Sequence, residues 1–559
     1  MIEITERWGL AKKGKWEIND QEIEIPNVFF LAGEGFHTPK AAEVSISTDE
    51  DSDFSLPSSF FGDIDEDHTF PAVFTYPDGT LKGEPETRAG DEKVQVIFDQ
   101  EPDPEAELYI LGNDPQFLKR SRRLYEKVVG LRRKIEYHKL IYAPGIATPK
   151  NMALLSYLGV DFFDSSFLEL LATDDVQLSD WMGFPGKPEK SHERLLSELF
   201  LVRKGIKEGR IRELVESRVR TEPWMVEVLR MADEDHDTFS KGIPVTGDDL
   251  YATTRESLNR PDIRRYRRRL RTRYEPPERD VLLLLPCSAR KPYFQSRTHR
   301  RLRDATQKGD WTNLQEVVLT SPLGAVPREL ELFYPAQQYD IPVSDEWFEE
   351  EKEMILEQLD IILNKGEYDE IISHLPPDMS FVPEEIDCLN TSDGERPTSS
   401  KAIDELAEAV RTYAGEKRGD VQRYLKQYMT VFTGFQFGGE GKVLLNDADV
   451  KGRYPWYKIM NDNVQRGMLV PERGLISLTL DGAKELKKEE IYQVEIDDFT
   501  PKGSVFAVGV KEASERIRPE DEAIVVHDDE LRGVGPASMS GQEMMEAEKG
   551  EAVRLRHYP

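Results

Sequence analysis

The sequence contains little cysteine and little histidine, and this scarcity excludes several kinds of site. Its 559 residues include two cysteines, Cys287 and Cys388, and nine scattered histidines. Two thiols cannot build a disulfide framework, a multi-cysteine zinc site or an iron–sulfur cluster. The histidines show no pair at metal-ligand spacing. We therefore expect no metal and no other bound cofactor in this chain.

Long hydrophobic runs are also missing. No stretch approaches the roughly 18 apolar residues of a membrane-spanning helix, and the first residues, MIEITERWGLAKKGKWE, lack the apolar core of a signal peptide. Hydrophobic residues nevertheless make up 38% of the chain, which is enough for folded cores. Because single cores rarely grow past about 250 residues, the length predicts three or four domains. We expect a cytoplasmic protein with no membrane contact.

Excess positive charge is missing as well. The chain has 74 basic and 106 acidic residues, a net charge of −32, which disfavours non-specific nucleic-acid binding over the whole surface. Residues 264–273 are a local exception, with seven arginines and no acid. Arginine suits bidentate phosphate contact, and for RNA binding we select Arg264, Arg265, Arg267 and Arg268. The alternative is a helix that lies on the acidic surface of its own domain.

The first 275 residues alternate short apolar runs with amphipathic stretches. The runs at 28–31, 94–98, 108–111, 140–143 and 160–164 are typical of strands. Thr148 and Pro149 predict the start of a helix, because threonine is a good N-cap and proline suits the first helical position. This rhythm of strand, turn, helix and strand predicts a parallel α/β domain.

A proline-rich boundary at 275–279 precedes a second α/β region. Its predicted strands are 281–285, 317–320 and 371–373, and a polar linker follows at 391–400. We predict one helix over 402–427 and a compact mixed region up to about residue 490. The last 70 or so residues contain short apolar runs with many turn residues, which predicts a small β-barrel.

The segment after residues 282–285 combines several chemically useful side chains. These four leucines predict a strand in the middle of a sheet, and ligands bind at the carboxyl ends of such strands. Cys287 follows directly. Arg290, Lys291 and the positive end of the next helix are expected to lower the pKa of its thiol. That helix begins either near Pro292 or after Ser296 as its cap.

A single cysteine after an apolar strand is more often a packing residue than a nucleophile, and one histidine beside arginines is often a surface residue. The combination within fourteen residues favours chemistry instead. As catalytic candidates we select Cys287, Lys291, Tyr293, Ser296 and His299.

These residues carry a resemblance to a known family. The pattern Pro-Cys-x-x-x-Lys-Pro-Tyr-x-x-Ser-x-x-His at 286–299 resembles the motif of archaeosine synthases at every defined position. The blocks at 319–324, 326–331, 334–336 and 339–343 resemble the same family, and the similarity extends over the whole chain.

The resemblance implies a multidomain α/β protein related to tRNA-guanine transglycosylase. Residues 1–275 would form a degenerate transglycosylase-like (β/α) barrel, 276–400 an α/β catalytic domain, 401–490 a small α+β domain and 491–559 a PUA RNA-binding β-barrel. Asp164 matches the position of the transglycosylase nucleophile. Because the zinc cysteines and the Asp-Ser-Gly-Gly motif of that enzyme are missing, we interpret Asp164 as a relic or a structural residue.

In the PUA segment, we select Lys502, Arg554 and Arg556 for phosphate contact. Their alternative is an ordinary exposed charge.

The family resemblance also implies a reaction. The substrate would be preQ0 (7-cyano-7-deazaguanine) in the D-arm of tRNA. The Cys287 thiolate would add to the nitrile carbon, and an amine would then displace the thiol. His299 would shuttle protons, and Lys291 would polarise the nitrile nitrogen or pair with a phosphate. Direct amine attack without a covalent intermediate remains an alternative.

The amine donor is either lysine or nitrogen from glutamine or ammonia, and the sequence does not decide between them. A radical-SAM partner subunit would complete the modification, since this chain has no cluster motif. A homodimer is possible. Two other functions stay open, namely an active tRNA-guanine transglycosylase and a non-catalytic tRNA-binding scaffold.

Overall fold

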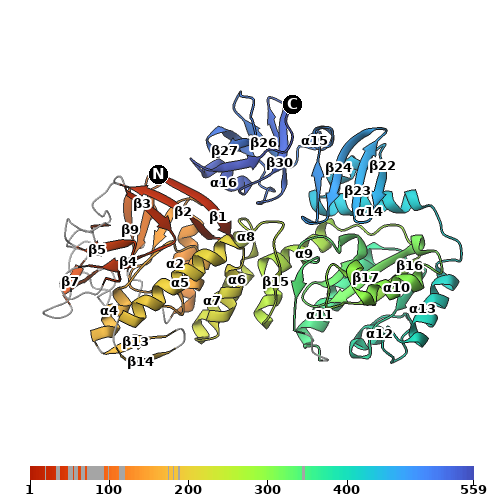
Figure 1. The fold of residues 1–559 in the computed structure, drawn as a ribbon, viewed down its shortest axis with the longest axis horizontal. Helices are drawn as coiled ribbons and strands as arrows, with labels where there is room; N and C mark the ends of the chain where they lie inside the picture. The colour runs from red at the N-terminus through yellow and green to blue at the C-terminus, as the bar shows by residue number, and fades with distance from the viewer. Residues whose placement is uncertain are drawn as a thin grey trace. The chain divides into compact units, whose positions relative to one another are not determined.

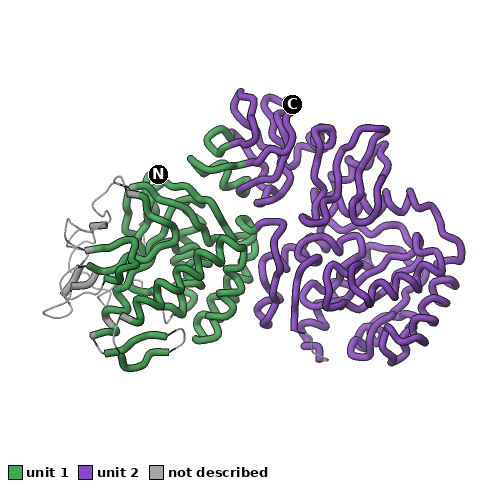
Figure 2. The backbone as a smooth tube through the Cα atoms, in the orientation of Figure 1, with its two compact units in different colours: residues 1–243, 506–510, 539–552 green, residues 244–505, 511–538, 553–559 purple. Residues whose placement is uncertain are grey.

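A computed structural model describes most of the chain. The described residues are 1–18, 21–32, 38–47, 54–55, 61–63, 69–71, 93–98, 100–112, 120–173, 175–179, 182–186, 189–342 and 346–559. Residue 343, at the end of one motif block, lies outside them. The chain divides into two compact units (Figure 2). Unit 1 comprises residues 1–243, 506–510 and 539–552, and unit 2 comprises residues 244–505, 511–538 and 553–559.

Unit 1 contains a parallel sheet with the order β6-β5-β4-β12-β11-β10-β9. Its strands are β4 (Asn27–Leu31), β5 (Val44–Ser47), β6 (Phe54–Ser55), β9 (Val94–Ile97), β10 (Leu108–Leu111), β11 (Leu140–Tyr142) and β12 (Phe162–Asp164). All five predicted apolar runs form strands here. Among the described residues β6 and β9 stand at opposite edges, so the closed barrel expected for 1–275 is not confirmed.

Residues 1–243 of unit 1 also contain a three-stranded antiparallel sheet, two two-stranded antiparallel sheets and helices (Figure 1), and β7 (Phe61–Asp63) pairs with β8 (Thr69–Pro71) in one of the two-stranded sheets. They include β1 (Ile2–Trp8), β2 (Ala11–Ile18), β3 (Gln21–Ile25), β13 (Val176–Leu178), β14 (Gly183–Pro185), α2 (Ser121–Arg132), α3 (Met152–Tyr157), α4 (Ser166–Thr173), α5 (Glu189–Lys207), α6 (Ile211–Val219), α7 (Pro223–Glu234) and α8 (His236–Phe239).

The helix predicted to open at Thr148 begins later, at Met152. The Thr148 amide donates to Asn151 Oδ1 over 2.8 Å, and the Asn151 side chain donates to the Ile146 carbonyl over 2.8 Å. The polar groups that would cap a helix at Thr148 instead hold a buried turn, so the prediction was wrong by one helical turn.

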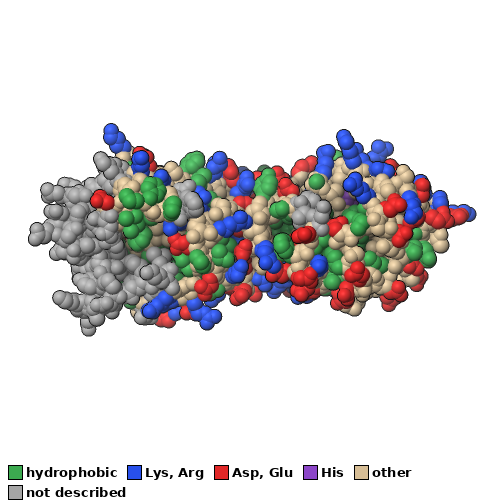
Figure 3. All heavy atoms as spheres, turned by 90° about the horizontal axis from the view of Figure 1, so that it is seen from below, with side chains coloured by type: hydrophobic (Ala, Val, Ile, Leu, Met, Phe, Trp, Pro, Cys, Tyr) green, Lys and Arg blue, Asp and Glu red, His purple; other side chains and the backbone are tan. Residues whose placement is uncertain are grey.

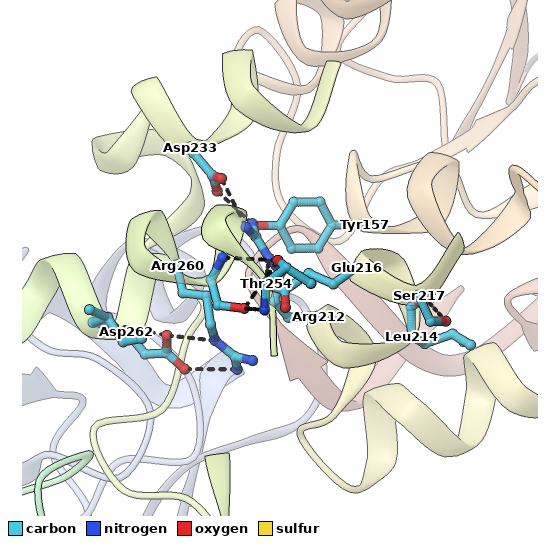
Figure 4. A network of polar contacts seen from close by, with 11 residues as sticks. Tyr157, Arg212, Leu214, Glu216, Ser217, Asp233, Thr254, Arg260 and Asp262 are labelled. Atoms are coloured by element: carbon cyan, nitrogen blue, oxygen red, sulfur yellow. Dashed lines mark hydrogen bonds and ion pairs between the residues drawn. The ribbon is translucent and has the colours of Figure 1, made fainter. Parts of the chain in front are cut away.

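A buried ion-pair network joins three helices of unit 1 (Figure 4). Arg212 of α6 donates to Asp233 of α7 over 2.8 Å, to Glu216 over 2.9 Å and to the Tyr157 hydroxyl of α3 over 3.0 Å. Because a buried charge is costly without partners, this network fixes the contacts among α3, α6 and α7.

Unit 2 is built around a five-stranded sheet with the order β18-β17-β16-β20-β21. Its strands are β16 (Val281–Pro286), β17 (Leu314–Thr320), β18 (Gly324–Pro327), β20 (Glu370–Ser373) and β21 (Leu389–Asn390). The three predicted strands are confirmed, and the leucine-rich β16 lies fully buried in the middle. Helices flank this sheet, among them α9 (Pro261–Arg273), α10 (Arg297–Thr306), α11 (Glu349–Lys365), α12 (Phe381–Glu385) and α13 (Ser400–Tyr413).

The single helix predicted over 402–427 is two helices. Helix α13 ends at Tyr413, and Gly415 then adopts a φ of 109°, a left-handed conformation that suits glycine. Helix α14 (Val421–Phe437) begins after Asp420, whose carboxylate accepts hydrogen bonds from the Gln422 and Arg423 amides. The glycine and the new cap break the helical pattern.

Two small regions follow α14. The first is an antiparallel sheet of β22 (Asp449–Arg453), β23 (Trp456–Asn461), β24 (Val464–Val470) and β25 (Leu475–Leu478), with α15 (Leu480–Lys487) after it. The last segment contains β26 (Gln493–Ile496), β27 (Ser504–Phe506), β28 (Val510–Ala513), β29 (Glu522–His527), β30 (Glu530–Pro536), α16 (Gly541–Glu546) and β31 (Glu551–Arg554). Among all described residues, no helix is both long and apolar enough to cross a membrane.

Candidate active site

Cys287 lies at the carboxyl end of the central strand β16 and is partly exposed. Its thiol shares a hydrogen bond with Thr320, the last residue of the neighbouring strand β17. Thr320 Oγ1 lies 2.5 Å from the Tyr339 hydroxyl, which lies 2.6 Å from the Tyr293 hydroxyl. A series of three hydroxyl groups therefore begins at Thr320, whose side chain favours the thiolate form of Cys287.

The environment of Cys287 raises the pKa of its thiol, contrary to the expectation from the sequence. Burial is the main cause, because a thiolate loses hydration there. The Thr320 hydrogen bond and the positive charge of Lys291 act in the opposite direction without outweighing burial. The resting residue is therefore a protonated thiol at neutral pH.

Lys291 stands over an aromatic ring of the same site. Its Nζ lies 4.0 Å from the centre of the Tyr339 ring, a cation–π contact. Burial lowers the pKa of Lys291, while the nearby Cys287 and Asp340 favour its charged form. Lys291, Tyr293 and Cys287 are therefore gathered as the motif predicts.

Ser296 is the N-cap of α10. Its Oγ accepts a hydrogen bond from the His299 amide over 3.0 Å, so the second of the two predicted helix starts is correct. This contact accounts for the serine at position 296, and it does not depend on the histidine side chain because the donor is a backbone amide. Ser296 therefore positions the helix through its hydroxyl oxygen, which accepts the hydrogen bond from the backbone.

His299 is held as a neutral imidazole. Its Nδ1 lies 3.0 Å from Arg328 Nη2 and accepts from it, since a guanidinium can only donate. Burial, and then the charge of Arg328, lower the pKa of His299 well below its ordinary value. Titration near neutrality, on which the proton-shuttle interpretation depended, is therefore wrong. The His299 ring lies 5.1 Å from that of Tyr293, which it helps to position.

Sequence reasoning did not assign roles to Thr320, Tyr339 or Arg328. All three fall in the motif blocks at 319–324, 326–331 and 339–343, which were noted only for their family resemblance. Their distance along the chain from Cys287 gives no spacing signal.

The four arginines selected on α9 do not form one exposed cluster. Arg265 and Arg267 donate to the backbone carbonyls of Pro244 and Leu258, and burial lowers the pKa of Arg267 to about 10. Arg268 is exposed and Arg264 is partly exposed. RNA contact stays a prediction for all four, and Arg268 is the most exposed of them.

The basic residues near the C-terminus lie close together. The Leu555 amide donates to the Gly503 carbonyl over 2.7 Å, which brings exposed Lys502 beside the strand with exposed Arg554. Arg556 makes two hydrogen bonds, of 2.9 and 2.8 Å, to the buried carboxylate of Glu522. On the face drawn in Figure 3, basic side chains lie interspersed with acidic ones.

Asp164 is fully buried at the end of β12. Its carboxylate accepts hydrogen bonds from the Tyr142 hydroxyl over 2.6 Å and from the Gly145 and Ser166 amides over 3.0 and 2.9 Å. Burial raises the pKa of Asp164. These contacts support a structural role for this carboxylate.

Fold and site together define a multidomain α/β protein with a strand-end cysteine and a C-terminal PUA domain. The family described as PUA domain matches residues 493–559. A family described as "Domain of unknown function (DUF5591)" matches residues 263–410, which include all five catalytic candidates.

Curated relatives identify the family. The archaeosine synthase subunit alpha of Methanosarcina acetivorans is 34% identical over 86% of each chain. The archaeosine synthase of Haloferax volcanii is 33% identical over 83% of this chain and 84% of its own. The chain belongs to the archaeosine synthase family. A more distant relative is the tRNA-guanine(15) transglycosylase of Methanocaldococcus jannaschii, 27% identical over 78% of this chain and 68% of its own.

Proposed function

We propose that this chain acts in archaeosine biosynthesis as the enzyme that adds an amine to the nitrile of preQ0 in the D-arm of tRNA. Family membership supports the pathway, and the PUA domain supports an RNA substrate. The observation that carries the reaction is Cys287, a partly exposed thiol at the carboxyl end of a central strand, connected to a series of hydroxyl groups and close to Lys291.

The proposed chemistry has two balanced steps. The Cys287 Sγ bonds to the nitrile carbon while the thiol proton reaches the nitrile nitrogen, which gives a thioimidate. The donor amine then bonds to the same carbon, the carbon–sulfur bond breaks, and a proton from the amine returns to sulfur. The product is a substituted amidine, and no oxidant or reductant is needed.

The surrounding residues support this sequence of events. Because the resting thiol is protonated, a proton path from sulfur is needed, and the hydroxyls of Thr320, Tyr339 and Tyr293 supply one. The Lys291 ammonium lowers the cost of forming a thiolate and can donate to the nitrile nitrogen. His299 and Ser296 act by positioning Tyr293 and helix α10.

The donor we favour is lysine, with glutamine or ammonia as the alternative. Conversion of the lysine adduct to archaeosine requires chemistry that a radical-SAM partner would supply. The M. acetivorans relative is named as a subunit alpha, which supports the existence of such a partner. Whether the chain forms a homodimer stays a prediction.

The decisive experiment is nucleoside mass spectrometry. The protein is incubated with preQ0-tRNA and with isotope-labelled lysine, glutamine or ammonium. We expect a mass increase that carries the lysine label. Cys287→Ser should abolish it, whereas the matched Cys388→Ser, which changes a thiol in the same unit, should not. Undiminished transfer by Cys287→Ser would refute covalent catalysis and leave direct amine attack.

The transglycosylase relative supports a second candidate, which is base exchange in tRNA. Incorporation of labelled guanine into tRNA would establish it. The two cysteines of this chain argue against it, because they cannot form the multi-cysteine zinc site of that enzyme. A non-catalytic scaffold would bind tRNA and leave every nucleoside mass unchanged.

A further inference from the structure

Unit 2 contains a cavity of about 180 Å³ that does not include Cys287 among its lining residues. Aromatic rings form much of its wall. They come from α14, from β23 and the turn before it, and from the segments that precede and follow α10 in the chain. They are Phe294, Trp311, Tyr424, Tyr428, Tyr454 and Tyr457. His299 also lines the cavity, and its ring contacts Tyr293 of the Cys287 site.

The rings of this cavity meet edge to face. The interplanar angles are 83° between Tyr428 and Tyr454, 74° between Tyr428 and Tyr457, and 61° between Tyr454 and Tyr457. Phe294 and Tyr454 meet at 88°. Rings arranged in this way surround a space from several directions, as in the aromatic cages that bind organic ammonium ions. A flat nucleobase would instead stack on the face of an aromatic ring.

Two of the three carboxylates around the cavity already have partners. Arg328 donates to Glu316 and to Glu331 over 3.1 Å, besides its contact with His299. Glu331 also accepts from the Tyr454 hydroxyl over 2.6 Å and from the Phe294 amide over 2.9 Å. Both of these carboxylates therefore already have hydrogen-bond donors.

Glu329 is different. Its side chain is 2% exposed, and its Oε2 has no hydrogen-bond partner among the described residues. The hydroxyl of Tyr428, also 2% exposed, likewise has none. Both residues line the cavity. Buried polar atoms without partners cost free energy, so Glu329 Oε2 and the Tyr428 hydroxyl indicate a ligand that donates hydrogen bonds to both. Nε2 of the neutral His299, which also lines the cavity, is a third buried atom without a partner among the described residues, and it is left to donate to an acceptor of the ligand.

We propose that this cavity binds a small aliphatic ammonium ion, with Glu329 as its counter-ion, the Tyr428 hydroxyl as a second acceptor and the aromatic rings as its cage. The volume supports a small ligand, since larger ligands use pockets of roughly 300–1,000 Å³. An ammonium group supplies three donors for the two acceptors. This inference rests on the proposed function: the ligand is the amine donor of that reaction, bound in its protonated ammonium form before transfer.

Calorimetric titration of the full chain in the absence of tRNA tests this assignment. The probes are L-lysine, norleucine, which lacks only the side-chain amine, and free 7-cyano-7-deazaguanine. We expect lysine to bind at least tenfold more tightly than norleucine. Glu329→Gln should weaken lysine binding at least tenfold and Tyr428→Phe severalfold. The control Glu357→Gln, at an exposed carboxylate of α11, should not change it.

Three results would overturn the assignment: no lysine binding, equal binding of norleucine, or lysine binding that is unchanged in Glu329→Gln. Binding of the free base that is lost in Glu329→Gln would also overturn it and assign the cavity to the nucleobase. If Glu329→Gln does not fold, tryptophan fluorescence of the wild-type chain provides a second readout, with Trp311→Phe as the reference that isolates the signal of Trp311 from the other six tryptophans. Lysine should change it and norleucine should not, and equal responses would contradict the proposal.

The same experiment separates this inference from the proposed function. Cys287→Ser should bind lysine as the wild type does while transferring none to tRNA. Lysine binding by a wild-type chain that leaves preQ0-tRNA unchanged would refute the proposed function alone. Transfer that does not depend on Glu329 would refute the ammonium site alone.

Discussion

At the scale of single residues, the Cys287 thiol is subject to two opposing influences. Burial raises its pKa, whereas the Lys291 charge lowers it. We therefore predict that Lys291→Met raises the pKa further and slows alkylation by iodoacetamide at neutral pH, by about tenfold for each pKa unit gained. The pH–rate profile, measured in a Cys388→Ser background so that one thiol reacts, checks this. An unchanged profile would show that Lys291 does not influence the thiol.

Glu329 gives a pH-dependent prediction. Burial raises its pKa to about 7, with Arg279 and Arg328 acting against this shift and Glu316 adding to it. The folded state thus keeps a proton that the unfolded state loses at lower pH. The contribution of Glu329 to the free energy of unfolding is therefore greatest below about pH 4.5, and it falls by about 3 kcal/mol as the pH rises to 7.

Glu329→Gln removes that dependence. Relative to the wild type, the variant should therefore gain stability between pH 5 and pH 8. Urea unfolding of both proteins at the two pH values measures the difference, in which the other titrating groups cancel. Glu357→Gln serves as the exposed control. If the free energies of unfolding of the wild type and Glu329→Gln change by the same amount between pH 5 and pH 8, Glu329 is ionised in the folded protein over this whole range.

At the residue level, the sequence predicted correctly that Cys287 and Lys291 lie close together, but it predicted the wrong direction for the pKa shift of the thiol. The motif placed Cys287 and Lys291 together correctly, because both follow one strand within five residues. The sign of the thiol pKa shift depends on how much water reaches the sulfur, and local sequence does not reveal this. The sequence also contains no indication of the cavity, because Glu329 and Tyr428, which line it, are far apart in the chain.

At the scale of elements, Ser296 is the N-cap of α10. Its loss should lower the stability of the fold, and it should affect the reaction only through that loss of stability. Ser296→Ala removes the acceptor for the His299 amide and should lower the free energy of unfolding by about 1 kcal/mol. Ser296→Asp keeps an acceptor and suits the positive helix end, so it should restore stability and activity. Urea unfolding and label transfer to tRNA check both variants. A stable but inactive Ser296→Asp would assign the serine a direct chemical role.

Element prediction was most reliable where one physical signal dominated. Four consecutive leucines indicate burial on both faces, and β16 is the central strand. Errors arose where side chains had two possible uses. Thr148 holds a turn with Asn151 instead of capping a helix. The prediction of one helix over 402–427 overlooked Gly415 and the Asp420 cap, which interrupt the helical pattern. Short polar side chains support both outcomes, and only tertiary packing selects between them.

At the scale of the whole molecule, a net charge of −32 must be reconciled with a polyanionic substrate. A chain with this charge repels tRNA at long range, so binding must depend on a few local cations. Arg265, Arg267 and Arg556 are engaged in internal contacts. Lys502 and Arg554 are exposed on neighbouring segments of the PUA domain, and we select them for phosphate contact on the ground of that exposure.

The salt dependence of tRNA binding measures this contribution. The Lys502→Ala/Arg554→Ala double variant should bind more weakly, and the slope of log affinity against log salt should fall by about 1–2. Arg411→Ala removes an exposed charge from α13 and should leave the slope unchanged. Because phosphate contacts carry no base information, the double variant should weaken binding of modified and unmodified tRNA equally. A loss confined to preQ0-tRNA would instead place these two residues at the modified nucleotide, since only contact with the base distinguishes the two tRNAs.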